Sequence, residues 1–226
     1  MAGWRQYRGF RRRIQAKHDA RFCVFLLLAS PVERLSCVNR LPYPVIMHRL
    51  FVALRPPPAI RQFLATAMGG VPGARWQDDD QVHLTVRYIG EVDGRVAEDI
   101  ALALGQIHAT APEVAIASAG AFDKQGRVDT LWAGVTPHDA LSALHRKVDQ
   151  ALVRAGLEPE RRAYLPHITL ARLARSAGAA PEVARWQADH AALSSPSFRL
   201  DKLVLYESHL ARDRAHYTPI MRWPLG

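Results

Sequence analysis

The chain has 226 residues, of which 49% are hydrophobic and 23% charged, and these proportions exclude a disordered, collagen-like or disulfide-rich protein. No apolar run approaches the roughly 20 residues that span a bilayer. The formal net charge is +9. Residues 1–46 hold nine Lys and Arg against two acids and so carry +7, which leaves only +2 for residues 47–226.

Residues 1–46 form a basic leader without clear periodicity. An apolar run at 22–29 gives it the outline of a secretory signal, but no good small-residue cleavage site follows. Both cysteines, Cys23 and Cys37, lie here, which excludes a disulfide framework and a thiolate zinc site from the rest of the chain. We expect a disordered or over-extended start, a targeting segment or a basic tail that touches nucleic acid, followed by one domain at 47–226.

From residue 47 onward the hydrophobic pattern predicts strands and helices in alternation. Residues 76–80 are predicted to form a loop, and Gly156 to end the longest helix. Several neighbouring strands are joined by turns too short for a helical crossover, which favours an α+β fold with mainly antiparallel sheets. The predicted strands are 49–54, 82–89, 113–119, 131–135, 167–173, 199–207 and 216–223, and the predicted helices are 60–67, 94–109, 138–155 and 181–192.

Two of the predicted strands carry the same pattern of His, apolar, Thr, apolar, at 83–86 and 167–170. Side chains alternate between the faces of a strand, so the His and Thr of each copy point the same way while the apolar residues face a core. A single copy of this pattern usually has no role beyond forming the strand. Two copies with matching flanks rarely arise by chance in a chain of this size. Two such strands facing one cleft would surround a small anion with two imidazoles and two hydroxyls.

These imidazoles and hydroxyls are suited to acid–base chemistry on a phosphoryl group. The unperturbed pKa of histidine is about 6.5, so His83 and His167 can serve as a general acid and a general base near neutral pH. The hydroxyls of Thr85 and Thr169 can donate to phosphoryl oxygens, and the guanidinium of Arg172 can bind them bidentately. The two histidines have neither helical spacing nor an acidic ligand on the same strand, so we expect no metal. The remaining histidines are expected mostly at the surface.

From residue 47 the sequence resembles the 2H phosphoesterase superfamily, and more closely the RNA 2′,3′-cyclic phosphodiesterases, also called 2′-5′ RNA ligases. The two His-x-Thr strands carry this resemblance, together with segments at 49–54, 131–135, 203–208 and 217–220. Val86 and Tyr88 replace the more usual Leu and Phe, which are conservative changes for a buried strand.

The resemblance implies a bilobal α+β fold whose two pseudo-symmetric halves each bring one His-x-Thr strand to a central cleft. It implies hydrolysis of RNA 2′,3′-cyclic phosphate ends to 2′-phosphomonoesters without metal or cofactor, and in some members the joining of tRNA halves through a 2′-5′ linkage. His83 and His167 become the catalytic pair, and Thr85, Thr169 and Arg172 the phosphate ligands. We expect a cytoplasmic monomer without membrane association.

In this interpretation His167 takes the proton of the attacking water and His83 protonates the departing 3′ oxygen; the sequence leaves the reverse assignment open. Two alternatives stand beside it: a phosphodiesterase for a small cyclic nucleotide, and a non-catalytic module that binds RNA ends. The stretch 161–175 holds four arginines and no acid, which favours a polymer, because each added phosphate contact increases electrostatic affinity.

Overall fold

The computed structural model describes residues 46–210 and 215–226, so nearly all of the expected leader lies outside the described residues. The strands form one nine-stranded sheet in the order β7-β4-β5-β6-β3-β1-β8-β9, with β2 beside β6, and every pairing is antiparallel. The predicted antiparallel α+β fold is therefore confirmed. The elements are β1 (Met47–Leu54), α3 (Pro58–Ala65), β2 (Ala74–Trp76), the 3₁₀ turn η2 (Asp79–Gln81), β3 (Leu84–Asp93), α4 (Gly94–Gly105), β4 (Glu113–Asp123), β5 (Val128–Thr136), α5 (Asp139–Arg154), β6 (His167–Leu173), α6 (Pro181–Asp189), β7 (Phe198–Arg199), β8 (Lys202–Leu210) and β9 (Ala215–Pro224).

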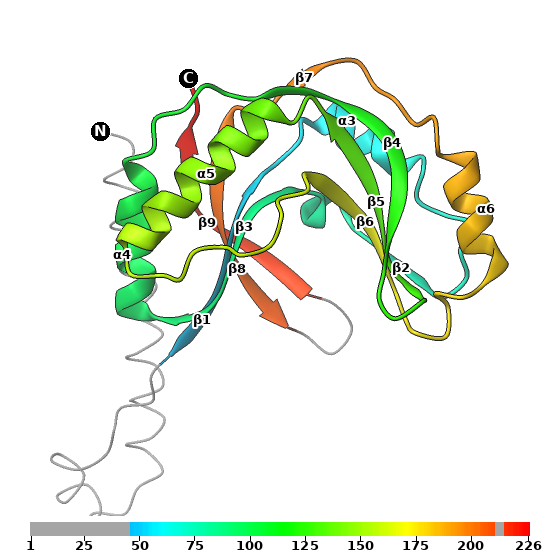
Figure 1. The fold of residues 1–226 in the computed structure, drawn as a ribbon, viewed down its shortest axis with the longest axis horizontal. Helices are drawn as coiled ribbons and strands as arrows, with labels where there is room; N and C mark the ends of the chain where they lie inside the picture. The colour runs from blue at the N-terminus through cyan, green and yellow to red at the C-terminus, as the bar shows by residue number, and fades with distance from the viewer. Residues whose placement is uncertain (1–45, 211–214) are drawn as a thin grey trace, which may run out of the picture.

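The two faces of the sheet differ in what covers them. Strand β1 shows this clearly: Leu50, Val52 and Leu54 lie in the main core, whereas Phe51 and Ala53 belong to a small cluster on the other face. Helices α4 and α5 pack against β1 and β3 beside the curved sheet (Figure 1). We call the face that carries Phe51 and Ala53 the open face. Within the described residues no helix is both long and apolar enough to cross a membrane.

Helix α5 illustrates how sequence pattern and packing agree. Its apolar residues at 141, 144, 148 and 152 recur at helical spacing and are buried against the sheet. Gly156 ends the helix with φ +92°, and the backbone N–H of Leu157 donates to the carbonyl of Leu152. That left-handed glycine with its backward hydrogen bond is a common way to satisfy the last carbonyls of a helix.

The sheet consists of two groups of strands that meet at one residue pair. The group β9-β8-β1-β3 joins the group β6-β5-β4-β7 through the pairing of Leu84 in β3 with Ile168 in β6. Both side chains are fully buried, and they occupy the same place in the two His-x-Thr copies. Each group thus brings one copy to the junction, while the pseudo-symmetry of two lobes stays a prediction.

Some predicted boundaries are wrong. Residues 74–76 form the short strand β2, which was not predicted and takes Trp76 from the loop expected at 76–80. Pairing with β6 orders this segment, which is too short to show periodicity. The strand predicted at 82–89 starts and ends later, since β3 spans Leu84–Asp93. The segment at 199–207 is divided between β7 and β8.

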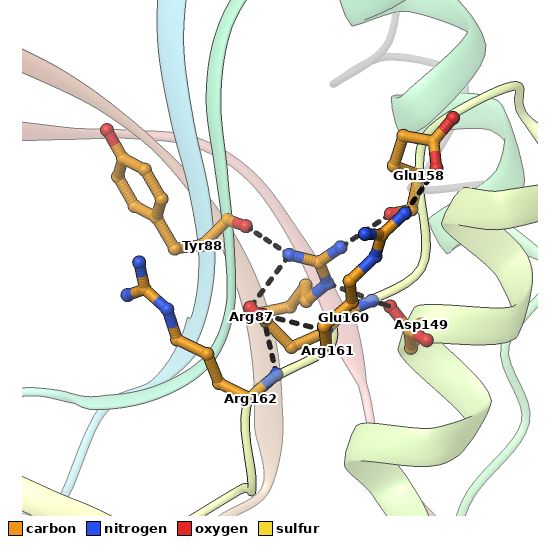
Figure 2. A network of polar contacts seen from close by, with 7 residues as sticks. All are labelled: Arg87, Tyr88, Asp149, Glu158, Glu160, Arg161 and Arg162. Atoms are coloured by element: carbon orange, nitrogen blue, oxygen red, sulfur yellow. Dashed lines mark hydrogen bonds and ion pairs between the residues drawn. The ribbon is translucent and has the colours of Figure 1, made fainter.

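An ion-pair network fixes the chain segment that leads into β6 (Figure 2). The Arg87 side chain, 11% exposed, donates to Asp149 on α5 (Nε–Oδ1 2.8 Å) and to Glu160 (Nη1–Oε2 3.1 Å). The other carboxylate oxygen of Glu160 accepts the backbone N–H groups of Arg161 and Arg162. Strand β3, helix α5 and the segment before β6 are therefore held by one guanidinium.

The junction pair sets a first prediction. Leu84→Ala and Ile168→Ala should each lower the free energy of unfolding by about 2–5 kcal/mol, because each opens a cavity in a fully buried position. Urea denaturation measures the loss. Leu102→Ala is the control, since that side chain is 51% exposed. Equal losses at the junction and at Leu102 would contradict the junction's structural role.

The network sets a second prediction. Arg87→Met should lower the free energy of unfolding by about 3 kcal/mol at neutral pH, because two largely buried carboxylates lose their cation. Arg49→Met removes the exposed pair with Glu91 and should cost less than about 1 kcal/mol. Both are read from urea denaturation. A loss for Arg87→Met no larger than for Arg49→Met would show that the network adds no stability.

Candidate active site

Both motif histidines are held by the same backbone contact. The Nδ1–H of His83 donates to the carbonyl of Gln81 at 2.6 Å, and that of His167 to the carbonyl of Leu165 at 2.8 Å. A carbonyl only accepts, so each Nδ1 carries the hydrogen and each Nε2 is left for proton transfer. Both rings are half-buried.

The junction between β3 and β6 brings the four motif side chains together on the open face. In an antiparallel pair, the neighbours of paired residues face each other across the strands. With Leu84 opposite Ile168, His83 therefore lies across from Thr169, and Thr85 across from His167. The structure thus brings together four residues that the sequence analysis selected, and neither threonine hydroxyl is hydrogen-bonded to another described residue.

Aromatic rings enclose His83. Its ring centroid lies 4.9 Å from that of Phe51, 5.2 Å from Tyr217 in a perpendicular contact, and 6.1 Å from Tyr206. Burial lowers the pKa of His83 to about 4, against the opposite effect of its hydrogen bond to the Gln81 carbonyl. The charges of His167 and Arg172 lower the pKa further, so this imidazole is neutral at pH 7 in the free protein.

His167 has its own aromatic neighbours. Phe122 meets its ring edge-on at 4.8 Å, and Trp132 lies at 6.4 Å. The Trp132 ring fits only because Gly120 on the neighbouring strand has no side chain: a Cβ there would overlap the indole. Burial lowers the pKa of His167, the Leu165 carbonyl opposes this, and the Arg172 charge adds to the lowering.

A β-bulge decides the position of Arg172. Strict alternation would place a residue five positions after His167 on the opposite face of the strand. However, Thr169 and Ala171 pair with consecutive residues of β5, so Leu170 is an extra residue in β6. The bulge reverses the alternation, and Arg172 comes to the same face as His167.

The Arg172 guanidinium is oriented by a chain of hydrogen bonds. Its Nη1 donates to the hydroxyl of Thr130 at 2.6 Å, and this hydroxyl donates to the Asp129 carboxylate at 2.8 Å. Thr130 is buried on β5, directly opposite Arg172. The remaining guanidinium N–H groups stay available to a ligand, as the predicted role in phosphate binding requires.

The first motif has a bulge at the equivalent place. Thr85 and Arg87 pair with consecutive residues of β1, so Val86 is the extra residue. Arg87 consequently lies on the helix-covered face, and Tyr88, opposite Phe51, lies on the open face. The expectation that Tyr88 is buried is wrong, since the residue is 51% exposed, whereas Val86 is buried as expected.

Several residues at the site carried no usable signal in the sequence. The rings of Phe51, Tyr206 and Tyr217 come from strands far apart in the chain, and only the sheet order brings them to His83. His48 is an exception to the expectation that the remaining histidines lie mostly at the surface, because it is buried and pairs with Glu207.

Gln81 positions the first histidine and was also missed. Its side chain is buried, its Nε2 donates to the Ala215 carbonyl at 2.6 Å, and its own carbonyl holds His83. In the described parts of the chain no group of three or more His, Cys, Asp or Glu side chains is placed to hold a metal ion.

Comparison with known proteins follows this geometry. The family model of the 2′-5′ RNA ligase superfamily matches residues 51–212. The RNA 2′,3′-cyclic phosphodiesterase of Escherichia coli is 31% identical over 183 residues, covering 78% of this chain and 96% of that protein. Proteins of the same name from Geobacillus stearothermophilus and Aeropyrum pernix are 29% and 33% identical, and the matches cover 74% and 46% of this chain. The chain spans little more than half the length of these two relatives, 52% and 59%.

Solved structures agree. A structure titled only as a phosphoesterase superposes with a TM-score of 0.66 at 27% identity, over 80% of this chain and 99% of that one. Escherichia coli LigT complexed with 3′-AMP superposes with a TM-score of 0.65 at 28% identity and the same coverage. From the two His-x-Thr strands, the sheet that joins them and these matches, we conclude that the chain belongs to the 2′-5′ RNA ligase superfamily.

Proposed function

We propose that this protein hydrolyses the 2′,3′-cyclic phosphate at the 3′ end of RNA to a 2′-phosphomonoester. One observation carries the proposal: two imidazoles with tethered Nδ1 and free Nε2 atoms share a sheet face with two unengaged threonine hydroxyls and an oriented arginine. The relatives named RNA 2′,3′-cyclic phosphodiesterase support this choice of reaction.

The proposed step needs one base and one acid. His167 takes a proton from water as the water oxygen bonds to phosphorus, and the bond between phosphorus and the 3′ oxygen breaks. His83 gives its proton to that oxygen, and the phosphate stays on the 2′ oxygen. Arg172, Thr85 and Thr169 bind the non-bridging oxygens, whose negative charge grows in the transition state.

Relative accessibility supports this assignment of roles. The contact between His167 and Leu165 is exposed, whereas that between His83 and Gln81 is partly buried, so water reaches His167 more readily. The low pKa of free His83 does not prevent it from acting as the acid, because a bound phosphate anion favours the charged imidazolium.

The substrate we propose is an RNA end, including the ends of tRNA halves, and the reverse reaction would join such halves through a 2′-5′ linkage. We also place the protein in the cytoplasm as a monomer that needs no metal or cofactor.

The histidine roles give a third prediction. His83→Ala and His167→Ala should each lower kcat on an oligonucleotide with a 2′,3′-cyclic phosphate end by about 10²–10⁴-fold, measured in EDTA. An activated diester that releases p-nitrophenolate needs no protonation of its leaving group. On that substrate His83→Ala should recover most of its activity and His167→Ala should not. The opposite pattern would reverse the two roles. Near-normal turnover of the cyclic-phosphate oligonucleotide by either variant would contradict the two-histidine mechanism, and binding of that oligonucleotide without turnover by the wild type would favour a non-catalytic RNA-end binding module.

The pH dependence gives a fourth prediction. Both histidine pKa values are lowered in the free protein, and catalysis needs one of the two protonated. Since kcat/KM reports the free enzyme, its maximum should lie below about pH 6.5 and fall as pH rises and the acid loses its proton. The kcat maximum should lie at higher pH, because the bound anion raises the pKa of the acid.

Arg172→Ala is the matched test of this pH argument. It removes a positive charge that lowers both pKa values, so the alkaline limb of kcat/KM should move to higher pH. An alkaline limb that lies above pH 6.5 in the wild type, or that does not move in the variant, would contradict the assignment.

A further inference from the structure

Strand β2 places a second arginine beside Arg172. The pairing of β2 with β6 sets Arg75 directly opposite Arg172, while Thr130 on β5 lies opposite Arg172 on its other side. Directly paired residues point to the same face. Thr130, Arg172 and Arg75 therefore form a row across three strands on the open face. The next residue of β2, Trp76, points to the other face and packs against Trp186 of α6 at 5.9 Å.

Among the described residues neither of the two opposed arginines is ion-paired with a carboxylate, and Arg172 is linked to Asp129 only through the Thr130 hydroxyl. Arg75 is exposed, and no described residue forms a hydrogen bond or ion pair with its side chain. Among the same residues the Arg172 side chain is hydrogen-bonded to Thr130 alone. Like charges directly opposite on paired strands are destabilising. Two other arginines of the sheet do have carboxylate partners, since Arg49 pairs with Glu91 and Arg87 with Asp149. An uncompensated pair of guanidinium groups is suited to bind an anion.

The charge of Arg75 has less effect on the two histidines than the charge of Arg172 has. The Arg172 charge lowers the pKa of both His83 and His167, and Arg75 exerts no comparable effect on either. Along β6, Arg172 and its partner Arg75 stand four residues from Ile168 at the junction, or about 10–13 Å. This distance is long enough for a second anion to be bound apart from the one at the histidine pair.

We propose that Arg75 binds a backbone phosphodiester of the RNA strand close to its 3′ end, so that the site distinguishes a strand from a mononucleotide. This inference rests on the proposed function, because the terminal phosphate must lie at the histidine pair. Arg172 then lies between the terminal phosphate and this phosphodiester, and Arg75 binds the phosphodiester. A guanidinium serves this purpose well, since it binds two phosphate oxygens at once without reading the base.

The test compares 2′,3′-cyclic AMP with a short oligonucleotide that ends in a 2′,3′-cyclic phosphate. Arg75→Ala should lower kcat/KM on the oligonucleotide about tenfold, which is the usual effect of one lost charge-assisted hydrogen bond. On 2′,3′-cyclic AMP it should lower kcat/KM by less than about twofold. The slope of log kcat/KM against log salt should flatten by about 0.7 on the oligonucleotide. Arg75→Lys should keep the slope and recover part of the rate, because it keeps the charge and loses the bidentate contact.

Arg185→Ala is the control, since that arginine is 83% exposed on α6 and its contact with Asp189 is long, 3.7 Å. It should change neither substrate. Equal losses on both substrates in Arg75→Ala, or no loss on the oligonucleotide, would overturn the proposal. A failure of the proposed function is recognised separately, because the wild type would then turn over neither substrate. Fluorescence anisotropy with a labelled oligonucleotide ending in a 2′-phosphate still tests Arg75, and equal affinities of wild type and Arg75→Ala would overturn the proposal.

Discussion

The backbone pairing of Leu84 with Ile168 is the constraint on which the site depends. It joins the two groups of strands, and it places the central residue of one His-x-Thr copy opposite the central residue of the other. Since both apolar side chains point into the core, the flanking His and Thr of each copy must point to the open face. One buried contact therefore sets both the continuity of the sheet and the geometry of the candidate active site.

The internal repeat extends beyond the motif itself. Each copy carries a one-residue bulge three positions after its histidine, at Val86 in β3 and at Leu170 in β6. The bulges give the two strands the same change of face, but the residues that follow differ in role. In β6 the change brings Arg172 to the histidines. In β3 it turns Arg87 toward Asp149 on α5 and Glu160 in the segment before β6, and it exposes Tyr88 on the open face. Bulges are frequent next to active sites because they redirect a side chain without moving the strand.

The positive charge near the two histidines on the open face favours the binding of an anion. Enclosure by aromatic rings and the nearby Arg172 both favour neutral imidazoles in the free protein. Binding a phosphate would offset these effects, because its negative charge favours the imidazolium. In the proposed mechanism the proton donor would therefore stay weakly protonated until the anionic substrate binds.

The sequence by itself determined the fold class, most elements and the five candidate site residues. The reason is that these signals are local. Period-two alternation and helical spacing depend on residues close in the sequence, and the repeated motif identifies its histidines and threonines without knowledge of tertiary contacts. The contact between Nδ1 and the carbonyl two residues earlier is equally local and is not specific, since exposed His108 makes the same contact with Gln106. Tertiary structure decided the rest. Strand β2 exists because it pairs with β6, and bulges set the faces of Arg172 and Tyr88. The ring enclosure of His83 and the opposition of Arg75 to Arg172 depend on which strands lie side by side, a long-range choice that no local pattern encodes.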